Sequence, residues 1–314
     1  MKIAELAEKA SKVQSEVEKA VVGKSAVVET ALAVLLSNGH LLIEDIPGVG
    51  KTTLAKAISR ALGLTFKRIQ FTPDLLPGDI TGSSIYNQKE GEFELRPGPI
   101  FSNIVLADEI NRTTPKTQAA LLESMEERTV TIDGATLMLP SPFFVIATQN
   151  NIELAGTYPL PEAQLDRFGA RIAIGYPPRE AELEILRNHR TSLPIESVMA
   201  VTTEEEIRAM QIAVREVHVD PSVQGYILDI VGATRTVPTV QLGASPRGAL
   251  SLMYASQARA AMQGREYVKP DDIKALAPSV LAHRLIVRPE QRVRGVTAET
   301  ILAEILDRVS VPTV

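Results

Sequence analysis

The residues with the clearest chemical potential lie in the stretch LIEDIPGVGKTT, residues 42–53. Glycines let a backbone curl so that successive N–H groups converge on a phosphate, and the N-terminus of a following helix adds partial positive charge. In such a loop, Lys51 would reach the β- and γ-phosphates of ATP, and the Thr52 hydroxyl would bind Mg²⁺. The residues predicted to bind the nucleotide here are Pro47, Gly48, Val49, Gly50, Lys51, Thr52 and Thr53.

One position departs from the full phosphate-loop pattern. That pattern has a glycine five residues before Gly50, and this chain has Asp45 there. The Gly-x-Gly-Lys-Thr part makes most of the phosphate contacts, and its context of strand, loop and helix is the one that the pattern requires. A chance glycine turn is the alternative explanation.

A pair of acids ends a second apolar run, residues 103–107. Because Mg²⁺ takes oxygen ligands and keeps several waters, Asp108 is predicted to hold the metal, mostly through water. Glu109 would polarise a water molecule for attack on the γ-phosphate. Paired acids after a strand are also common as helix caps, so their catalytic interpretation depends on the phosphate loop.

A third apolar run, residues 143–148, is followed by Gln149, Asn150 and Asn151. An amide at this strand end could orient the attacking water and sense the γ-phosphate, and Asn150 is the preferred candidate. The alternative is an Asx turn.

The positions of these motifs require a parallel sheet. Four short apolar runs are predicted as strands, at residues 40–44, 103–107, 143–148 and 171–174, and helical patterns such as 53–62 and 115–127 lie between them. Alternating strands and helices imply right-handed crossovers, with helices on both faces of the sheet.

Two further features interrupt or follow this alternation. Residues 79–101 and 129–139 are predicted as β-hairpins, the second around Asp133-Gly134. Beyond Pro177-Pro178 the chain is predicted to be helical, at 179–187, 203–217, 221–234, 246–263 and 270–281. We therefore predict an α/β nucleotide-binding core with an N-terminal helix at 1–177, and a helical domain at 178–314.

The composition is that of an ordinary globular protein, with 45% hydrophobic and 23% charged residues among 314. A net charge of −5 gives no global basic field for nucleic acid, and the absence of cysteine excludes disulfides and thiolate metal sites. The charged N-terminal helix pattern lacks a signal-peptide core, and no transmembrane segment is predicted, so a cytoplasmic location is expected. The acids Glu123, Glu126 and Glu127 are predicted to form a solvated helix face.

Several long blocks resemble the MoxR family of AAA+ ATPases. They include EDIPGVGKTTLAKA, LRPGPIFSNIVLADEINRTTPKTQAALLESMEERTVTIDG and ATQNNIELAGTYPLPEAQLDRF. The match covers nearly all of residues 21–177 and is looser beyond. It implies a P-loop NTPase core with a parallel sheet, β-hairpin insertions and a C-terminal all-α lid. The family often has proline where this chain has Asn151, and we expect only a small effect on loop rigidity.

The resemblance also implies roles for residues outside the motifs. Arg167 is similar to the arginine finger that reaches a neighbouring subunit's γ-phosphate, a role that suits a permanently charged guanidinium. Arg112 is a second candidate for that role. Arg247 resembles the sensor arginine that closes the lid over the nucleotide of its own subunit. Val22 and Gly23 resemble the strip that lies against adenine.

Three functions remain open from the sequence. The resemblance implies an ATP-driven ring, in many cases a hexamer, that remodels client proteins or inserts cofactors, often with a partner bearing a von Willebrand factor A domain. A DNA-translocating or loading motor is the alternative, although the two hairpins carry few basic residues, chiefly Lys89 and Arg96. A P-loop phosphotransferase is the third, but it would need neither a trans-acting arginine nor a large helical lid.

Overall fold

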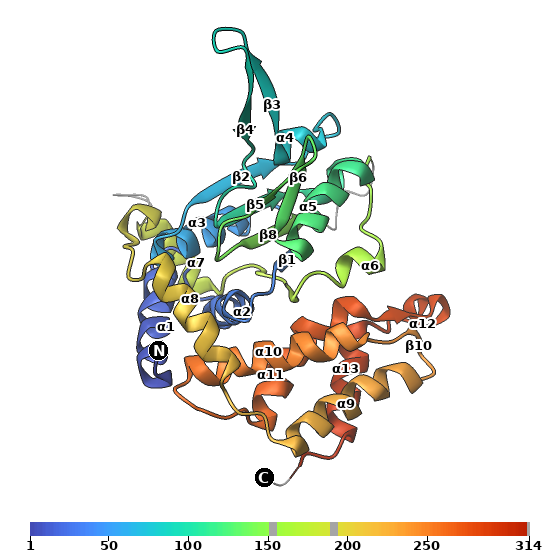
Figure 1. The fold of residues 1–314 in the computed structure, drawn as a ribbon. Coiled ribbons are helices and arrows are strands. Elements are labelled where there is room, and N and C mark those ends of the chain that lie inside the picture. The colour runs from blue at the N-terminus through green and yellow to red at the C-terminus, as the bar shows by residue number, and fades with distance from the viewer. Residues whose placement is uncertain (151–155, 189–193, 313–314) are drawn as a thin grey trace.

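A computed structural model describes residues 1–150, 156–188 and 194–312 of the chain. Its centre is a five-stranded parallel sheet with the strand order β2-β5-β8-β1-β9 (Figure 1). The strands are β1 (Leu41–Glu44), β2 (Phe66–Gln70), β5 (Ile104–Asp108), β8 (Phe144–Gln149) and β9 (Ala170–Ile172). The predicted α/β fold with a parallel P-loop sheet is confirmed.

The central strands form because their apolar residues are buried on both faces of the sheet. On β5, Ile104 and Leu106 join an apolar cluster with α2 (Ser25–Leu36) and α3 (Lys51–Leu62), whereas Val105 and Ala107 join a second cluster with α5 (Pro115–Glu127). Continuous apolar runs are typical of such doubly covered strands. The edge strand β2 was not predicted, because its sequence FKRIQ has only Ile69 buried and shows no such run.

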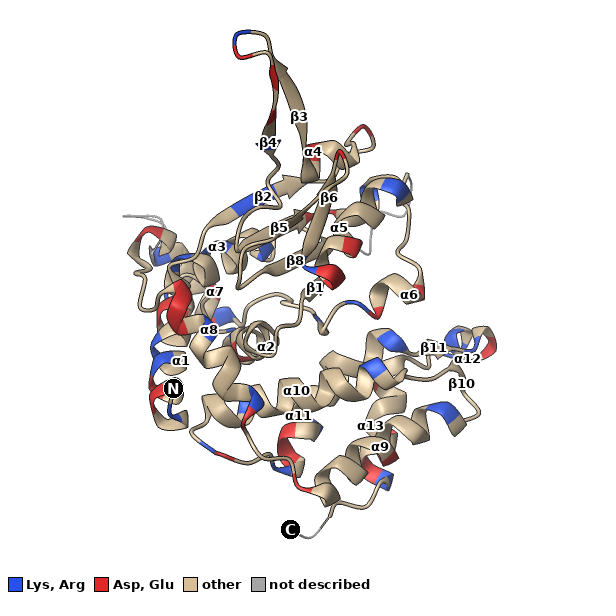
Figure 2. Ribbon diagram, viewed as in Figure 1, with Lys and Arg blue, Asp and Glu red and all other residues tan. Residues whose placement is uncertain are grey.

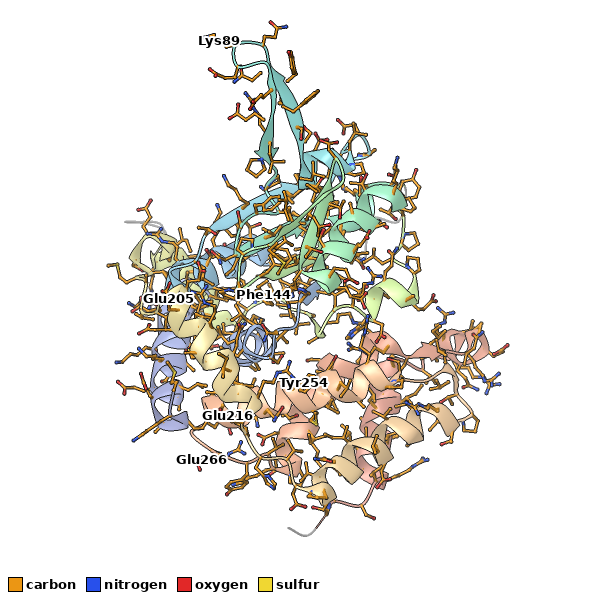
Figure 3. All side chains as sticks on the ribbon, viewed as in Figure 1. Lys89, Phe144, Glu205, Glu216, Tyr254 and Glu266 are labelled. Carbon is orange, nitrogen blue, oxygen red and sulfur yellow. The ribbon has the colours of Figure 1, made fainter. Side chains whose placement is uncertain are left out.

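Both predicted hairpins are present. The first pairs β3 (Gly82–Asn87) with β4 (Glu92–Pro97), follows the short helix α4 (Pro77–Thr81) and projects well away from the sheet (Figure 1). Lys89 lies at its tip (Figure 3). The second pairs β6 (Thr129–Ile132) with β7 (Ala135–Met138). Its turn contains Asp133 and Gly134, both with positive φ, as a tight turn of this kind requires.

The remaining α-helices lie at the N-terminus, between β8 and β9, and after β9. They are α1 (Ile3–Glu18), α6 (Glu162–Leu165), α7 (Arg179–Asn188), α8 (Glu204–Arg215), α9 (Pro221–Thr236), α10 (Pro246–Met262), α11 (Pro270–Leu281), α12 (Pro289–Val293) and α13 (Ala298–Arg308). Helix α10 begins with a Ser245 cap and Pro246 at its first turn, and it packs on α1 and α2. A small antiparallel sheet of β10 (Val240–Leu242) and β11 (Ile286–Val287) was not predicted. The predicted division at residue 177 stays a prediction.

Within the described ranges, no helix is both long and apolar enough to cross a membrane. The departure at Asn151 lies outside the described residues.

Candidate nucleotide-binding site

The phosphate loop has the predicted context of strand, loop and helix. Strand β1 ends at Glu44, the loop follows, and α3 begins at Lys51. Gly48 has a φ of +83° and Gly50 a φ of +92°, and nothing lies within 4 Å of where a Cβ would stand on either residue. Only glycine adopts this conformation without strain, and the open space is where a phosphate would fit.

Lys51 lies across this loop. Its Nζ donates to the carbonyl oxygen of Asp45 and, at 2.9 Å, to that of Gln149. Burial lowers the pKa of the Lys51 ammonium, while the charges of Asp45, Asp108, Glu109 and Glu44 act to raise it again. The lysine therefore donates to two neutral carbonyl oxygens near several acids. A phosphate, which is a stronger acceptor, could replace these carbonyls as its partner.

The predicted metal-binding acid, Asp108, ends β5 next to this loop. Its Oδ1 accepts a hydrogen bond of 2.6 Å from the Thr148 hydroxyl, and its Oδ2 lies 2.6 Å from Arg68 Nη2. Within the described parts of the chain, no three His, Cys, Asp or Glu residues are grouped to hold a metal ion. Oxygen donors such as Asp108 and the Thr52 hydroxyl suit Mg²⁺, with phosphate oxygens and water completing its shell.

Glu109 follows in an uncommon backbone conformation. Its φ is +58°, in the left-handed region, and its N–H donates to the Thr148 hydroxyl at 2.8 Å. Its carboxylate accepts from Gln70 Nε2 at 3.0 Å and pairs with Arg112 Nε at 3.2 Å. Such conformations cost about 1–3 kcal/mol and cluster at functional sites. Arg112, the second candidate for an arginine finger, thus lies beside the acid of its own chain.

Two amides stand at the end of β8, the strand between β5 and β1: Gln149 is its last residue, and Asn150 follows it. Asn150 is buried, and it lies at the same sheet edge as the phosphate loop and the acids, since all three strands run in parallel. Asn150 is the amide predicted from the sequence to sense the γ-phosphate, in preference to Gln149. The Gln149 Nε2 atom is nevertheless buried without a hydrogen-bond partner in the described structure, so it is a second donor available to a phosphate or water.

A cleft of about 580 Å³ adjoins the phosphate loop. Its lining includes Val22 from the segment after α1, Val49 and Thr53 from the loop and α3, and Tyr176 and Pro177 from the segment after β9. The apolar side chains of this lining are suited to a base. Gly23 does not line this cleft but makes a turn with φ of +72°, where a Cβ would meet the Ala181 side chain at 3.0 Å.

Arg167 and Arg247 do not line this cleft. Arg167 Nε is 3.1 Å from Glu126 Oε2, and Arg247 Nη2 pairs with the other oxygen of the same carboxylate. These residues, with Arg128, Asp166 and Arg215, line a second cavity of about 240 Å³. Glu126 is therefore not simply part of a solvated face, as the sequence suggested, but joins α5 to Arg167 and to the start of α10.

This cavity lies at the amino ends of β1 and β9, whereas the phosphate loop lies at the carboxyl end of β1. Arg167 shortly precedes β9, and the Gly169 N–H donates to the carbonyl of His40 at 2.7 Å, just before β1. The phosphate loop follows the other end of β1, and a strand of this length spans about 13 Å. Neither arginine therefore lies with its own chain's phosphate loop. For Arg247, this placement does not favour the expected contact with the nucleotide of its own subunit.

Comparisons with known proteins agree with this architecture. The model of the ATPase family associated with various cellular activities (AAA) matches residues 40–170, and the AAA lid domain matches residues 232–305. A crystal structure of a protein from Cytophaga hutchinsonii, provisionally named an ATPase, aligns with a TM-score of 0.92 and 39% identity over 99% of this chain and 97% of that one.

Three curated relatives cover nearly the whole chain. The uncharacterized protein YeaC of Bacillus subtilis is 54% identical, over 96% of this chain and 94% of its own length. Chaperone MoxR1 of Mycobacterium tuberculosis is 42% identical, over 95% and 81%, and protein MoxR of Methylorubrum extorquens is 31% identical, over 91% and 90%. With its phosphate loop, paired acids and helical lid, the chain belongs to the MoxR family of AAA+ ATPases.

Proposed function

We propose that the chain binds ATP with Mg²⁺ and hydrolyses it to ADP and phosphate. The observation that carries this proposal is that four polar residues lie at the carboxyl end of the parallel sheet, beside a glycine loop with open space around Gly48 and Gly50. These residues are Lys51, Asp108, Glu109 and Asn150. The apolar cleft beside the loop would take the base.

Each residue would perform a separate step. Lys51 would leave the carbonyls of Asp45 and Gln149 for the β- and γ-phosphates, since a charged oxygen is the stronger acceptor. Asp108 and the Thr52 hydroxyl would hold Mg²⁺, which neutralises charge that develops on the phosphates. Glu109 would accept the proton of the attacking water, which requires that its carboxylate exchange the contacts with Gln70 and Arg112 for the water.

The complete site would need a neighbouring copy of the chain. Arg167 and Arg247 are fixed at the edge of the sheet opposite to their own phosphate loop, so they could stabilise γ-phosphate charge only on another subunit. A head-to-tail arrangement brings opposite surfaces of two copies together and closes into a ring when the rotation permits. We propose such a ring, with six subunits as the expected number.

The work performed by this ring would be the remodelling of partner proteins. The name of the relative Chaperone MoxR1 supports a chaperone role, and we propose assembly or cofactor insertion in client proteins, with a partner bearing a von Willebrand factor A domain, in the cytoplasm. The charges of the projecting hairpin weigh against a DNA motor, because acids line β4 near the few bases (Figure 2). The guanidinium of Arg128, beside the second hairpin, donates to the carbonyl oxygens of Phe143 and Asn38, which leaves it less able to bind a DNA phosphate.

The variant Glu109→Gln tests this proposal. It keeps the shape of the side chain but cannot accept the proton, so we expect ATP binding to be retained and the steady-state hydrolysis rate to fall at least about 100-fold. Glu123→Gln, a change of the same type at an exposed position of α5, is the matched control and should hydrolyse ATP at the rate of the unmodified protein. Rapid hydrolysis by Glu109→Gln would refute the role of Glu109.

A further inference from the structure

The acid that replaces the first glycine of the phosphate loop has a specific structural environment. A carboxylate at this position would repel a nucleotide if it faced the phosphates. Instead, Asp45 Oδ1 accepts from the N–H of Ile46 at 2.8 Å, and its Oδ2 accepts from the N–H groups of Ile174 and Gly175, both at 2.6 Å. Three backbone donors thus compensate the charge, and hydrogen bonds to a carboxylate are among the stronger kinds in proteins.

Two of these donors belong to the segment that leaves the sheet after β9. Gly175 has a φ of +65°, and the next two residues, Tyr176 and Pro177, form a wall of the nucleotide cleft. The same segment is held from a second side, because Lys24 Nζ donates to the Tyr176 carbonyl at 2.9 Å. The wall of the cleft is therefore attached to the phosphate loop through one side chain, that of Asp45.

The backbone of Asp45 is also in contact with the functional groups of the site. Its carbonyl accepts from Lys51, and its N–H donates to the carbonyl of Gln149 at 3.2 Å. One residue thus connects the lysine, the end of strand β8 just before Asn150, and the wall of the cleft. A glycine at position 45 would keep the backbone contacts but lose every contact of the carboxylate.

We propose that Asp45 is a positioning residue that fixes the segment 174–177 against the phosphate loop and so shapes the cleft for the base. The proposal rests on the nucleotide site proposed above. The general pattern of the loop has glycine at this position, so Asp45→Gly would be expected to preserve nucleotide binding or strengthen it. Asp45→Gly restores the usual glycine, yet it should weaken nucleotide binding, because it leaves the N–H groups of Ile174 and Gly175 without their acceptor and frees the backbone of the loop.

The test measures nucleotide affinity and the attachment of the segment separately. Binding of a fluorescent ADP analogue is compared for the unmodified protein, Asp45→Gly and Asp45→Asn, and amide hydrogen exchange of the segment 174–177 is followed without nucleotide. Asn keeps the size and one acceptor oxygen but loses the charge. The control is Asp74→Asn, at an exposed loop aspartate whose pKa is lowered mainly by a local hydrogen bond with Thr72.

We expect Asp45→Gly to bind the analogue about 10-fold more weakly, which corresponds to about 1.4 kcal/mol, with Asp45→Asn between it and the unmodified protein. Exchange of the Ile174 and Gly175 amides should become faster in both variants and stay unchanged in Asp74→Asn. Unchanged affinity in Asp45→Gly, or unchanged exchange in it, would overturn the proposal. If the unmodified protein bound no nucleotide, the proposed function would fail, while the exchange measurement would still decide whether Asp45 holds the segment.

Discussion

The separation of Arg167 from its own phosphate loop leads to a strong prediction about mixed assemblies. Lys51→Ala removes the phosphate contact and keeps the arginine, whereas Arg167→Ala removes the arginine and keeps the loop. Each variant alone should be nearly inactive. An arginine finger is worth about 10³–10⁵ in rate, and without Lys51 the β- and γ-phosphates lose the ammonium group that contacts them.

Mixing the two variants should restore activity if Arg167 acts on a neighbour. A site is intact when its loop comes from an Arg167→Ala subunit and its arginine from a Lys51→Ala subunit. With equal and random mixing of independent sites, this occurs at about a quarter of the interfaces, so we expect about 25% of the unmodified rate. If Arg167 acted within its own subunit, every subunit would lack one component and the rate would stay at background.

The assay uses the two variants co-expressed with different tags and purified on both, followed by steady-state phosphate release. Co-assembly of Lys51→Ala with Glu109→Gln is the matched control. These residues lie at the same edge of the sheet in one chain, so no combination of such subunits contains an intact site. Absence of rescue in the Lys51→Ala and Arg167→Ala mixture would refute the assignment of Arg167 to the neighbouring site. Rescue in the control would refute the placement of Lys51 and Glu109 in the same site.

Two further predictions concern Glu126 and His40. Glu126→Gln releases Arg167 and Arg247, so kcat should fall several-fold without a change in the Kd for ATP, while Glu127→Gln should change neither; an altered Kd with normal kcat would contradict this. Burial lowers the pKa of His40 to about 3, and the positive charge of Arg128 lowers it further. The neutral ring accepts a hydrogen bond from the Val145 N–H at 3.0 Å. The stabilisation from neutral His40 is complete above its ordinary pKa of 6.5 and is lost as the pH falls toward 3, by up to about 1.4 kcal/mol per pH unit. Urea unfolding should therefore show a weaker loss of stability between pH 6.5 and 4 in His40→Gln than in the unmodified protein, and equal slopes would contradict the prediction.

The sequence predicted the parts of the fold whose side chains are buried on both sides. Strands β5 and β8 consist of continuous apolar residues, and each ends in the polar residues that reach the site, so both the sheet and its functional edge could be inferred. Strand β2 could not be inferred, because an edge strand exposes Lys67 and Arg68 and its pairing with β5 depends on the tertiary fold.

The contacts that complete the site depend on residues far apart in the chain. Glu126 looks like an exposed helix acid in sequence, and only the tertiary fold brings Arg167, shortly after α6, and Arg247, in the first turn of α10, to its carboxylate. Gln70 contacts Glu109 because β2 and β5 are neighbours, although the residues are far apart in sequence. Asp45 was recognised as a departure from the loop pattern, but its hydrogen bonds to Ile174 and Gly175 could not be read from the pattern.

Every role proposed for this site requires the loop around Gly50 and Lys51 to bind the phosphates of a nucleotide. Equilibrium titration of ATP with Mg²⁺ into the unmodified protein and into Lys51→Ala measures this binding. We expect saturable binding by the unmodified protein and at least about 100-fold weaker binding by Lys51→Ala, since a charged hydrogen bond to phosphate is lost in a partly buried site. Equal affinity of the two proteins for ATP would show that Lys51 does not bind the phosphates and would refute the proposed nucleotide site.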